Sequence, residues 1–336
     1  MKALNVDFLL QNLQQNWSPL VNDDLQKFIL DPANSVLNKK GKGFRSRIVE
    51  AGYLWATQIN TAVADQPFAK PYFTEICNMV EILQSASLII DDIQDGAQVR
   101  RGVRPFHLDH GIPLAINTGT WLYFLPQMIL NQIDISPIQY KKLSQLINET
   151  LVLAHLGQGL DLSLKASDMH ESEYATKVLS TMRLKTGALL ALAFTAPAII
   201  CNLDENNILL IKEFATDLGA FLQMCDDLGN LNPSAQEKRF EDLHNGRLTF
   251  IHWAVHQWAT DAEKKQFQQA LLQLPQTTAL VDWVQNIQFL NTAKQYQWNF
   301  IQNSVHKLSS RFSKEVPNDT IEFLQNICID IFKSYE

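Results

Sequence analysis

The sequence predicts an all-α protein, and three observations predict it. Apolar residues recur at three- and four-residue spacing along most of the 336-residue chain, which is the period of an amphipathic helix. Glycine and proline number only 13 and 12, so few positions interrupt such helices. No segment shows the alternation of apolar and polar residues that is typical of a half-buried strand. We therefore predict a bundle of helices that forms a single domain over residues 1–336.

Two long helices are the clearest elements. The first leads into an acidic motif, and five of its residues hold the helical spacing: Ile76, Val80, Leu83, Ser87 and Ile90. The second begins at residue 136, because Ser136 suits the N-cap and Pro137 suits the first helical position. Loops are predicted where glycine, proline and polar residues gather, at residues 65–71, 102–113, 232–237 and 317–319.

The chain shows no targeting or membrane signal. Its N-terminus "MKALNVDFLLQNLQQNW" is soon interrupted by amides and has no small-residue cleavage site, so we predict no signal peptide. The longest apolar run, residues 188–203, contains Pro197 and is shorter than the roughly 20 residues that a membrane span needs. We expect a soluble, cytoplasmic protein.

Composition excludes several classes of function. The net charge of −7, with 19% charged residues, is unfavourable for a nucleic-acid binder, which needs a basic surplus to contact phosphates. The cysteines lie far apart and form no Cys-x-x-Cys pair, which indicates reduced core thiols rather than a disulfide framework or a zinc site. They are Cys77, Cys201, Cys225 and Cys328.

Two segments, "LIIDDIQD" and "LQMCDDLGN", carry acidic motifs of one kind. In the first, Asp91 and Asp95 lie one turn apart on one helix face, with Asp92 beside them. The second repeats the spacing with an amide in the last place, in Asp226, Asp227 and Asn230. Carboxylates so close repel one another unless a cation lies between them, and oxygen ligands suit Mg²⁺. The alternative for one such run alone is a solvated helix end.

Basic residues in the same short segments favour the metal interpretation. They are Lys42, Arg45 and Arg47 in "GKGFRSR", Arg100, Arg101 and Arg104 after the first acidic motif, Lys185 in "RLKTG", and Lys238 and Arg247 in "EKRFEDLHNGR". Lysine and arginine bind phosphate groups, and Mg²⁺ joins phosphates to carboxylates, so the set predicts a polyphosphate pocket. A di-iron site would need two Glu-x-x-His motifs, and only Glu241 with His244 has that spacing.

In order and spacing, these motifs resemble the trans-isoprenyl diphosphate synthase (polyprenyl synthetase) family, and most closely its eukaryotic-type geranylgeranyl diphosphate synthases. The resemblance covers roughly residues 38–255 and rests on "GKGFRSR", "SLIIDDIQD" with "VRRG", "HLGQGLDL", "KTG" and "FLQMCDDLGN". The family commonly ends its second motif in Asp, whereas this subfamily carries Asn, as at Asn230. The resemblance implies an isoprenoid-synthase-type helical bundle around a central cavity, with the two motifs facing each other across its mouth.

The resemblance also implies a reaction and a role for each matching residue. The reaction is head-to-tail condensation of an allylic diphosphate with isopentenyl diphosphate. Three Mg²⁺ ions would be held by Asp91, Asp95 and Asp226, with Asp92, Asp227 and Asn230 in support. The allylic diphosphate would be bound by Arg100, Lys185 and Lys238, and isopentenyl diphosphate by Lys42, Arg45 and Arg101. Thr186 and Gln223 would aim dipoles at the allylic cation.

Three positions depart from the family pattern, and they bear on the isopentenyl diphosphate site. Gln84 stands where the family usually has a histidine, and an amide can donate a hydrogen bond there but cannot become a cation. Arg247 stands where lysine is usual, and Leu156 where the subfamily tends to carry arginine.

Product length depends on the depth of the implied cavity. Ala86 and Ser87, just before the first motif, are small and should admit a chain longer than fifteen carbons. A helical turn rises about 5.4 Å, near the length of one isoprene unit, so each deeper turn admits roughly one more unit. By the resemblance, Tyr123, Phe124 and His155 form the floor, although such residues are more often plain core. We expect geranylgeranyl diphosphate as the product.

Two other functions stay open on the same scaffold. Gln84 motivates a terpene cyclase, which would ionise a long allylic diphosphate without condensation. A non-catalytic partner subunit is the other alternative, but such a chain should have lost aspartates, and five of the six motif positions here are Asp. The family is usually homodimeric through a helix face, so a homodimer is expected.

Overall fold

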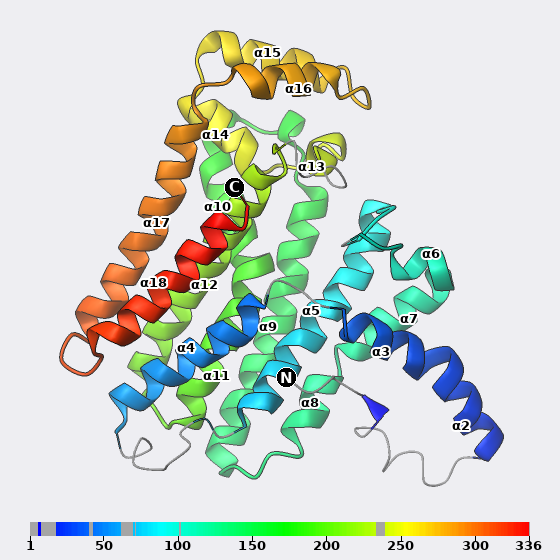
Figure 1. The fold of residues 1–336 in the computed structure, drawn as a ribbon, viewed down its shortest axis with the longest axis vertical. Coiled ribbons are helices and arrows are strands. Elements are labelled where there is room, and N and C mark those ends of the chain that lie inside the picture. Colours follow the sequence, from blue (N-terminus) through cyan, green and yellow to red (C-terminus); the bar gives the residue numbers. More distant parts are fainter. Residues whose placement is uncertain are drawn as a thin grey trace. The chain divides into compact units, whose positions relative to one another are not determined.

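The computed structural model describes residues 6–7, 18–39, 43–61, 70, 72–100, 102–232 and 239–335. Every element in these ranges is a helix, which confirms the predicted all-α class (Figure 1). The chain divides into two compact units, Met1–Glu149 with Leu192–Leu203 and Thr150–Ala191 with Asp204–Glu336. Two of the three boundaries fall inside helices, α9 (Pro137–Ser163) and α11 (Ala188–Ile200), and the third falls between α11 and α12. The single domain over residues 1–336 stays a prediction.

The first unit is built around α5 (Phe73–Asp95), which packs against α3, α4, α6, α7 and α8 (Figure 1). The elements of this unit besides α5 are α2 (Pro19–Leu25), the π-helix η1 (Gln26–Leu30), α3 (Asp31–Leu37), α4 (Phe44–Ile59), α6 (Phe106–His110), α7 (Ile112–Leu122) and α8 (Leu125–Leu130). A glycine sets the α5–α7 approach, because a Cβ on Gly119 would lie 2.7 Å from Ile90 Cδ1. The acid-bearing end of α5 is thereby held against α7.

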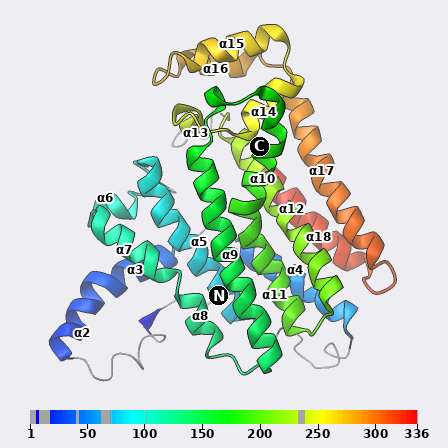
Figure 2. The ribbon, with the colours of Figure 1, turned by 180° about the vertical axis from the view of Figure 1, so that it is seen from behind.

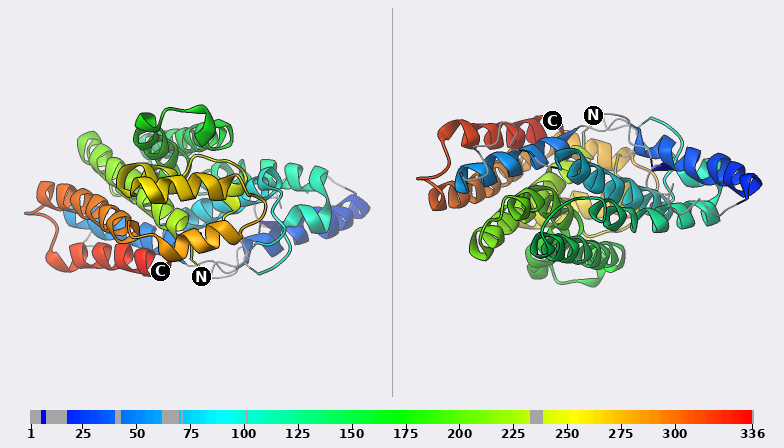
Figure 3. Two further views of the ribbon diagram at one scale, coloured as in Figure 1. Left: turned by 90° about the horizontal axis from the view of Figure 1, so that it is seen from above. Right: turned by 90° about the horizontal axis from the view of Figure 1, so that it is seen from below.

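The second unit is built around α12 (Glu205–Gly229), which packs against α10, η4, α14, α17 and α18 (Figure 2). The other elements are η2 (Ala166–Asp168), η3 (Glu171–Glu173), α10 (Tyr174–Met182), the π-helix η4 (Arg183–Gly187), α13 (Glu241–His244), α14 (Phe250–Trp258), α15 (Asp261–Leu271), α16 (Thr278–Asn286), α17 (Leu290–Arg311) and α18 (Asn318–Lys333). Figure 3 shows α15 and α16 lying side by side. Aromatic rings join α14 to α17, with the Trp253 and Tyr296 centroids 5.2 Å apart.

The predicted start of α9 is confirmed, and the cap explains it. The Ser136 amide donates to Gln139 Oε1 at 3.0 Å, and the Gln139 amide donates to Ser136 Oγ at 3.3 Å. The predicted loop at residues 102–113 was wrong in part, because it contains α6 and the start of α7. Pro105 is the N-cap of α6 and Pro113 lies in the first turn of α7, so these prolines begin helices instead of breaking them.

The other predicted loops can be compared only in part. Residues 65–69, 71 and 233–237 lie outside the described ranges. The predicted loop at residues 317–319 is shorter than expected, because α18 already begins at Asn318.

The four cysteines are buried free thiols, as the sequence predicts. Burial raises the pKa of Cys77, Cys201 and Cys328 to about 12. These thiols are therefore protonated and poorly reactive at neutral pH.

Two helical stretches, Phe73–Asp95 and Glu171–Ile200, are long and apolar enough to cross a membrane by length and composition alone. Core helices of soluble proteins pass the same test, and 78% of the apolar window in the second stretch is buried within the protein. A soluble, cytoplasmic location stays a prediction.

Candidate active site

The first acidic motif lies at the C-terminal end of α5. Gly96 ends the helix in the left-handed region, at φ 63°, and the Ala97 amide donates to the Asp92 carbonyl at 3.0 Å. Asp91 and Asp95 are half-buried, whereas Asp92 is 4% exposed. The helix period therefore separates one inward carboxylate from two more accessible ones.

Arg100 supplies the counter-charge to this motif. Its guanidinium pairs with Asp92 and lies 3.3 Å from Asp91 Oδ2. A backbone bridge between Arg100 and Val103, with N···O distances of 2.8 and 3.3 Å, sets the Arg100 backbone. Arg104 instead pairs with Asp109 at 2.9 Å on the exposed surface. Arg101 lies outside the described residues.

Arg45 reaches the face of α5 that carries Gln84. Its guanidinium lies 3.3 Å from Glu81 Oε2, and Glu81 precedes Gln84 by three residues, nearly one helical turn. The structure therefore places Arg45 beside α5 within about one turn of Gln84, and the binding of isopentenyl diphosphate by both residues stays a prediction. Lys42, predicted to bind the same substrate, lies outside the described residues.

The predicted floor residues have different surroundings. Ala86 is buried beneath α7, and the Ser87 hydroxyl donates to the Gln84 carbonyl at 2.9 Å. Burial, and then the charge of Asp91, raise the pKa of Tyr123 to about 12, so the Tyr123 hydroxyl lies in the field of the first motif. Phe124, in contrast, is 67% exposed.

His155, the fifth predicted floor residue, belongs to the second unit. It lies on the exposed side of α9, where its Nδ1 is 2.8 Å from the Leu151 carbonyl. A floor made from these five residues stays a prediction.

A chain of hydrogen bonds in the second unit orients Thr186 and Gln223, the two residues predicted to aim dipoles at the allylic cation. The Thr186 hydroxyl donates to Gln223 Oε1 at 2.8 Å, and Gln223 Nε2 donates to Asp227 Oδ1 at 2.9 Å. Asp227 Oδ2 accepts from the Phe250 amide at 2.8 Å. Both oxygens of this buried carboxylate are thus used to hold α12, η4 and the start of α14. Burial raises the pKa of Asp227 well above its usual value, and the Asp242 charge adds to the increase.

Asp226 differs from its neighbour. It is half-buried, and its carboxylate makes no hydrogen bond or ion pair with any of the residues that the structure describes. Asn230 is the C-cap of α12, and its backbone amide donates to the Asp226 backbone carbonyl at 3.0 Å. The second motif therefore divides, like the first, into a carboxylate committed to structure and a more accessible one.

Asp161 connects two of the predicted cations. Its Oδ2 accepts from Lys185 Nζ at 2.8 Å and from Arg247 Nη1 at 3.2 Å. Arg247 is 3% exposed and also lies 3.8 Å from Asp242 Oδ1. Although 28% of the Asp242 side chain is exposed, the protein packed around its carboxyl and then the charge of Asp161 raise its pKa to about 6.

Three glycines set the backbone spacing in this region. A Cβ on Gly157 of α9 would lie 2.3 Å from the Lys185 amide nitrogen, and one on Gly219 of α12 would lie 2.4 Å from Gly187 Cα. The segment between them is the π-helix η4, which carries Lys185 and Thr186. A π-helical turn often marks a functional site because it turns side chains away from their α-helical directions. Close packing on both sides keeps η4 in this form.

Sequence reasoning missed Asp161, Asp242 and Glu81. Asp161 had a usable signal, because it follows Gly157 by four residues and so lies on the helix face that meets Lys185. Asp242 lies in the same basic segment as Arg247, and no local pattern marks it as a partner. Lys238, predicted to bind diphosphate, lies outside the described residues.

The donor chemistry fits magnesium. The accessible side chains of both motifs offer carboxylate and amide oxygens, which suit a hard ion that fills its remaining positions with water and phosphate. Within the described ranges, no group of three or more Asp, Glu, His or Cys side chains is placed to hold an ion by itself. Prenyl synthases of this type generally use Mg²⁺.

Comparison with known proteins agrees with this geometry. The polyprenyl synthetase family model matches residues 26–287. A geranylgeranyl pyrophosphate synthase from Dictyostelium discoideum is 30% identical over 69% of this chain and 70% of that protein. The geranylgeranyl pyrophosphate synthase dpasD from Apiospora sacchari is 31% identical over 68% of this chain and 64% of that protein.

The fold is also that of a solved prenyl synthase. The polyprenyl synthase from Caulobacter crescentus CB15, solved with calcium and isoprenyl diphosphate, aligns with a TM-score of 0.69 at 18% identity, covering 99% of both chains. The predicted family and fold are thus confirmed, and the chain belongs to the polyprenyl synthetase family.

Proposed function

We propose that the protein condenses an allylic prenyl diphosphate with isopentenyl diphosphate and forms geranylgeranyl diphosphate. The observation that carries the proposal is that both acidic motifs, each at the end of a long helix, divide in the same way. Asp92 and Asp227 are buried in structural contacts, whereas Asp91, Asp95 and Asp226 are half-buried. The names of the relatives from Dictyostelium and Apiospora support the choice of product.

We assign the accessible carboxylates to a cluster of three Mg²⁺ ions bound to the allylic diphosphate, and propose that the two motifs converge on it. The ligands are Asp91, Asp95 and Asp226, and the fixed cations on the same diphosphate are Arg100, Lys185 and Lys238. Isopentenyl diphosphate is assigned to Lys42, Arg45, Gln84, Arg101 and Arg247. The ions would neutralise negative charge that develops on the leaving diphosphate.

The reaction begins when the allylic carbon–oxygen bond breaks and its electron pair moves to the diphosphate oxygen. Arg100 and Lys185 stabilise the departing charge more strongly in the transition state than in the ground state. The Thr186 hydrogen is donated to Gln223, so the lone pairs of the Thr186 oxygen stay available to the allylic cation. The double bond of isopentenyl diphosphate then forms the new carbon–carbon bond, and the released diphosphate takes the proton.

Product length follows from the wall of α5. Ala86 and Ser87 are too small to stop the chain at fifteen carbons, and the charge of Asp91 on α5 acts on the buried Tyr123 hydroxyl. We propose that its ring closes the shaft at the twenty-carbon stage.

We also propose a homodimer, supported by exposed apolar side chains on α7 and in the turn after it. Ile112 and Ile116 lie one turn apart on α7, Phe124 lies in the turn before α8, and all three are exposed. Exposed apolar surface of this kind is typical of an interface, and self-association is the commonest assembly. Ile116→Glu should shift the sedimentation mass toward one chain, whereas Lys142→Glu should leave the mass unchanged.

Product analysis tests the function. Pure protein incubated with Mg²⁺, farnesyl diphosphate and isopentenyl diphosphate should yield a twenty-carbon diphosphate. No elongation with any allylic primer would reject the proposal. Release of a hydrocarbon or alcohol from geranylgeranyl diphosphate alone would identify a terpene cyclase, and activity only with an added catalytic chain would identify a partner subunit.

A further inference from the structure

An ion pair outside both acidic motifs ties the start of η4 to α12. Arg183, the first residue of η4, donates to Asp217 Oδ1 from Nε at 2.9 Å and from Nη2 at 2.7 Å. The other oxygen of Asp217 accepts from the Ser304 hydroxyl of α17 at 3.0 Å. One carboxylate on α12 therefore joins three elements, and both of its oxygens accept hydrogen bonds.

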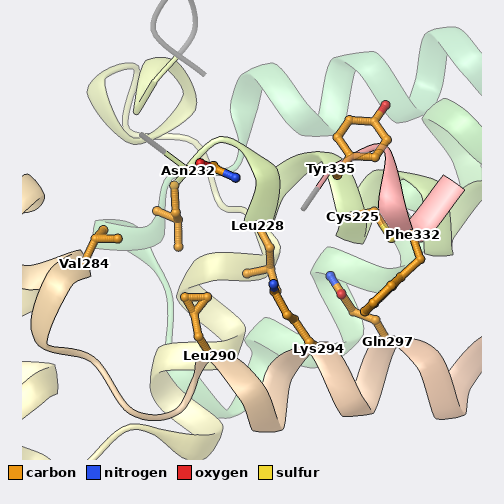
Figure 4. Close-up of a pocket in the computed structure, with 10 residues that line it drawn as sticks. Cys225, Leu228, Asn232, Val284, Leu290, Lys294, Gln297, Phe332 and Tyr335 are labelled. Atoms are coloured by element: carbon orange, nitrogen blue, oxygen red, sulfur yellow. The ribbon is translucent and has the colours of Figure 1, made fainter. Parts of the chain in front are cut away.

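The helix α17 also holds α12 at a second point. The buried Gln297 donates from Nε2 to the Met224 carbonyl at 2.7 Å. Figure 4 shows the Gln297 side chain extending from α17 toward α12, where it lines a pocket. The two contacts are about two turns apart on each helix, from Asp217 to Met224 on α12 and from Ser304 to Gln297 on α17. The stretch of α12 before its acidic motif is thus held at both ends.

This stretch of α12 is also where η4 is attached. The Arg183–Asp217 pair holds the start of η4, and the hydrogen bond from Thr186 to Gln223 holds its other end. Lys185 lies between these two links. The π-helical form is rare, so contacts from outside η4 have to maintain it. The ion pair is therefore placed to decide how η4 presents Lys185 and Thr186.

We propose that Asp217 is a positioning residue, which acts through Arg183 to hold Lys185 and Thr186 in place beside α12. Its effect on turnover rests on the proposed function, in which Lys185 stabilises the departing diphosphate and Thr186 faces the allylic cation. Displacing a positioned group by about 1 Å can cost about a hundredfold in rate. Because Arg183 is 43% exposed, the pair adds little to global stability, and its loss should leave the chain folded.

Hydrogen exchange of the full chain, followed by mass spectrometry, tests the positioning. Asp217→Ala and Arg183→Met should each speed exchange at the amides of η4 about tenfold, because the lost pair opposes local opening. Glu213→Ala is the matched control, since Glu213 lies one turn earlier on α12 and pairs with Lys307 of α17, outside η4. Its exchange in η4 should equal that of wild type. Equal exchange in all three variants overturns the proposal.

Steady-state kinetics of elongation test the consequence. Asp217→Ala and Arg183→Met should each lower kcat about tenfold or more, and the double variant should lose no more than either single one, because both changes remove one interaction. The KM for isopentenyl diphosphate should stay near the wild-type value, since none of the residues assigned to that substrate lies on η4. Glu213→Ala should keep the wild-type kcat.

An unchanged kcat in Asp217→Ala, or additive losses in the double variant, overturns the proposal. If Asp217→Ala does not fold, Arg183→Met decides alone, because the Arg183 side chain is half-exposed. A wild-type protein that elongates no primer refutes the proposed function instead, and the exchange measurement still decides whether Asp217 holds η4.

Discussion

Replacing Asp161 with alanine should destabilise the second unit measurably. The carboxylate accepts from both Lys185 and Arg247, and the Arg247 side chain is only 4% exposed. Removing one partner of a buried ion pair costs about 3–5 kcal/mol, because the remaining charge stays buried without compensation. Asp242 still lies 3.8 Å from Arg247 and Lys185 is partly exposed, so we expect the lower figure, about 3 kcal/mol.

Thermal unfolding followed by circular dichroism at pH 7 measures this effect. At about 2 °C per kcal/mol for a chain of this size, the melting temperature should fall by about 6 °C. Asp168→Ala, which removes an exposed aspartate on η2, should stay within about 1 °C of wild type. Equal melting temperatures for the Asp161 and Asp168 variants would refute the argument that Asp161 compensates the buried cations.

Three further predictions follow from the same structure. Gly157→Ala should unfold the protein or lower its urea midpoint sharply, because the new Cβ would lie 2.3 Å from a backbone nitrogen of η4. Gly159→Ala places its Cβ in open space and should be neutral or slightly stabilising. Equal urea midpoints for the two variants would contradict the close contact at Gly157. The pKa of Asp242 is raised from 3.8 to about 6, so its contribution to stability is full below about pH 4 and is lost as pH rises to about 6. Urea titrations at pH 4 and pH 6 should therefore show the stability of wild type relative to Asp242→Asn falling by about 2 kcal/mol, and a constant difference would contradict the shifted pKa. Tyr123→Ala should lengthen the product in chromatographic analysis, and unchanged length would remove Tyr123 from the floor.

The sequence predicts the features that depend on local periodicity. The helical class, the start of α9 at Pro137 and the positions of both acidic motifs at helix ends all follow from spacing and caps. The pairing of Asp161 with Arg247 could not be predicted, because the two residues lie 86 positions apart and no local pattern couples them. The π-helical form of η4 depends on glycines in two other helices, and the short helix α6 depends on a proline that serves as its cap. Tertiary packing decides these features.

A crystal structure of the protein with Mg²⁺ and a non-hydrolysable farnesyl diphosphate analogue tests the central claim most directly. The account predicts one diphosphate whose bound ions are held by Asp91 and Asp95 from α5 together with Asp226 from α12. Ions held by one motif alone, with the other motif's carboxylates turned away from the diphosphate, would contradict it.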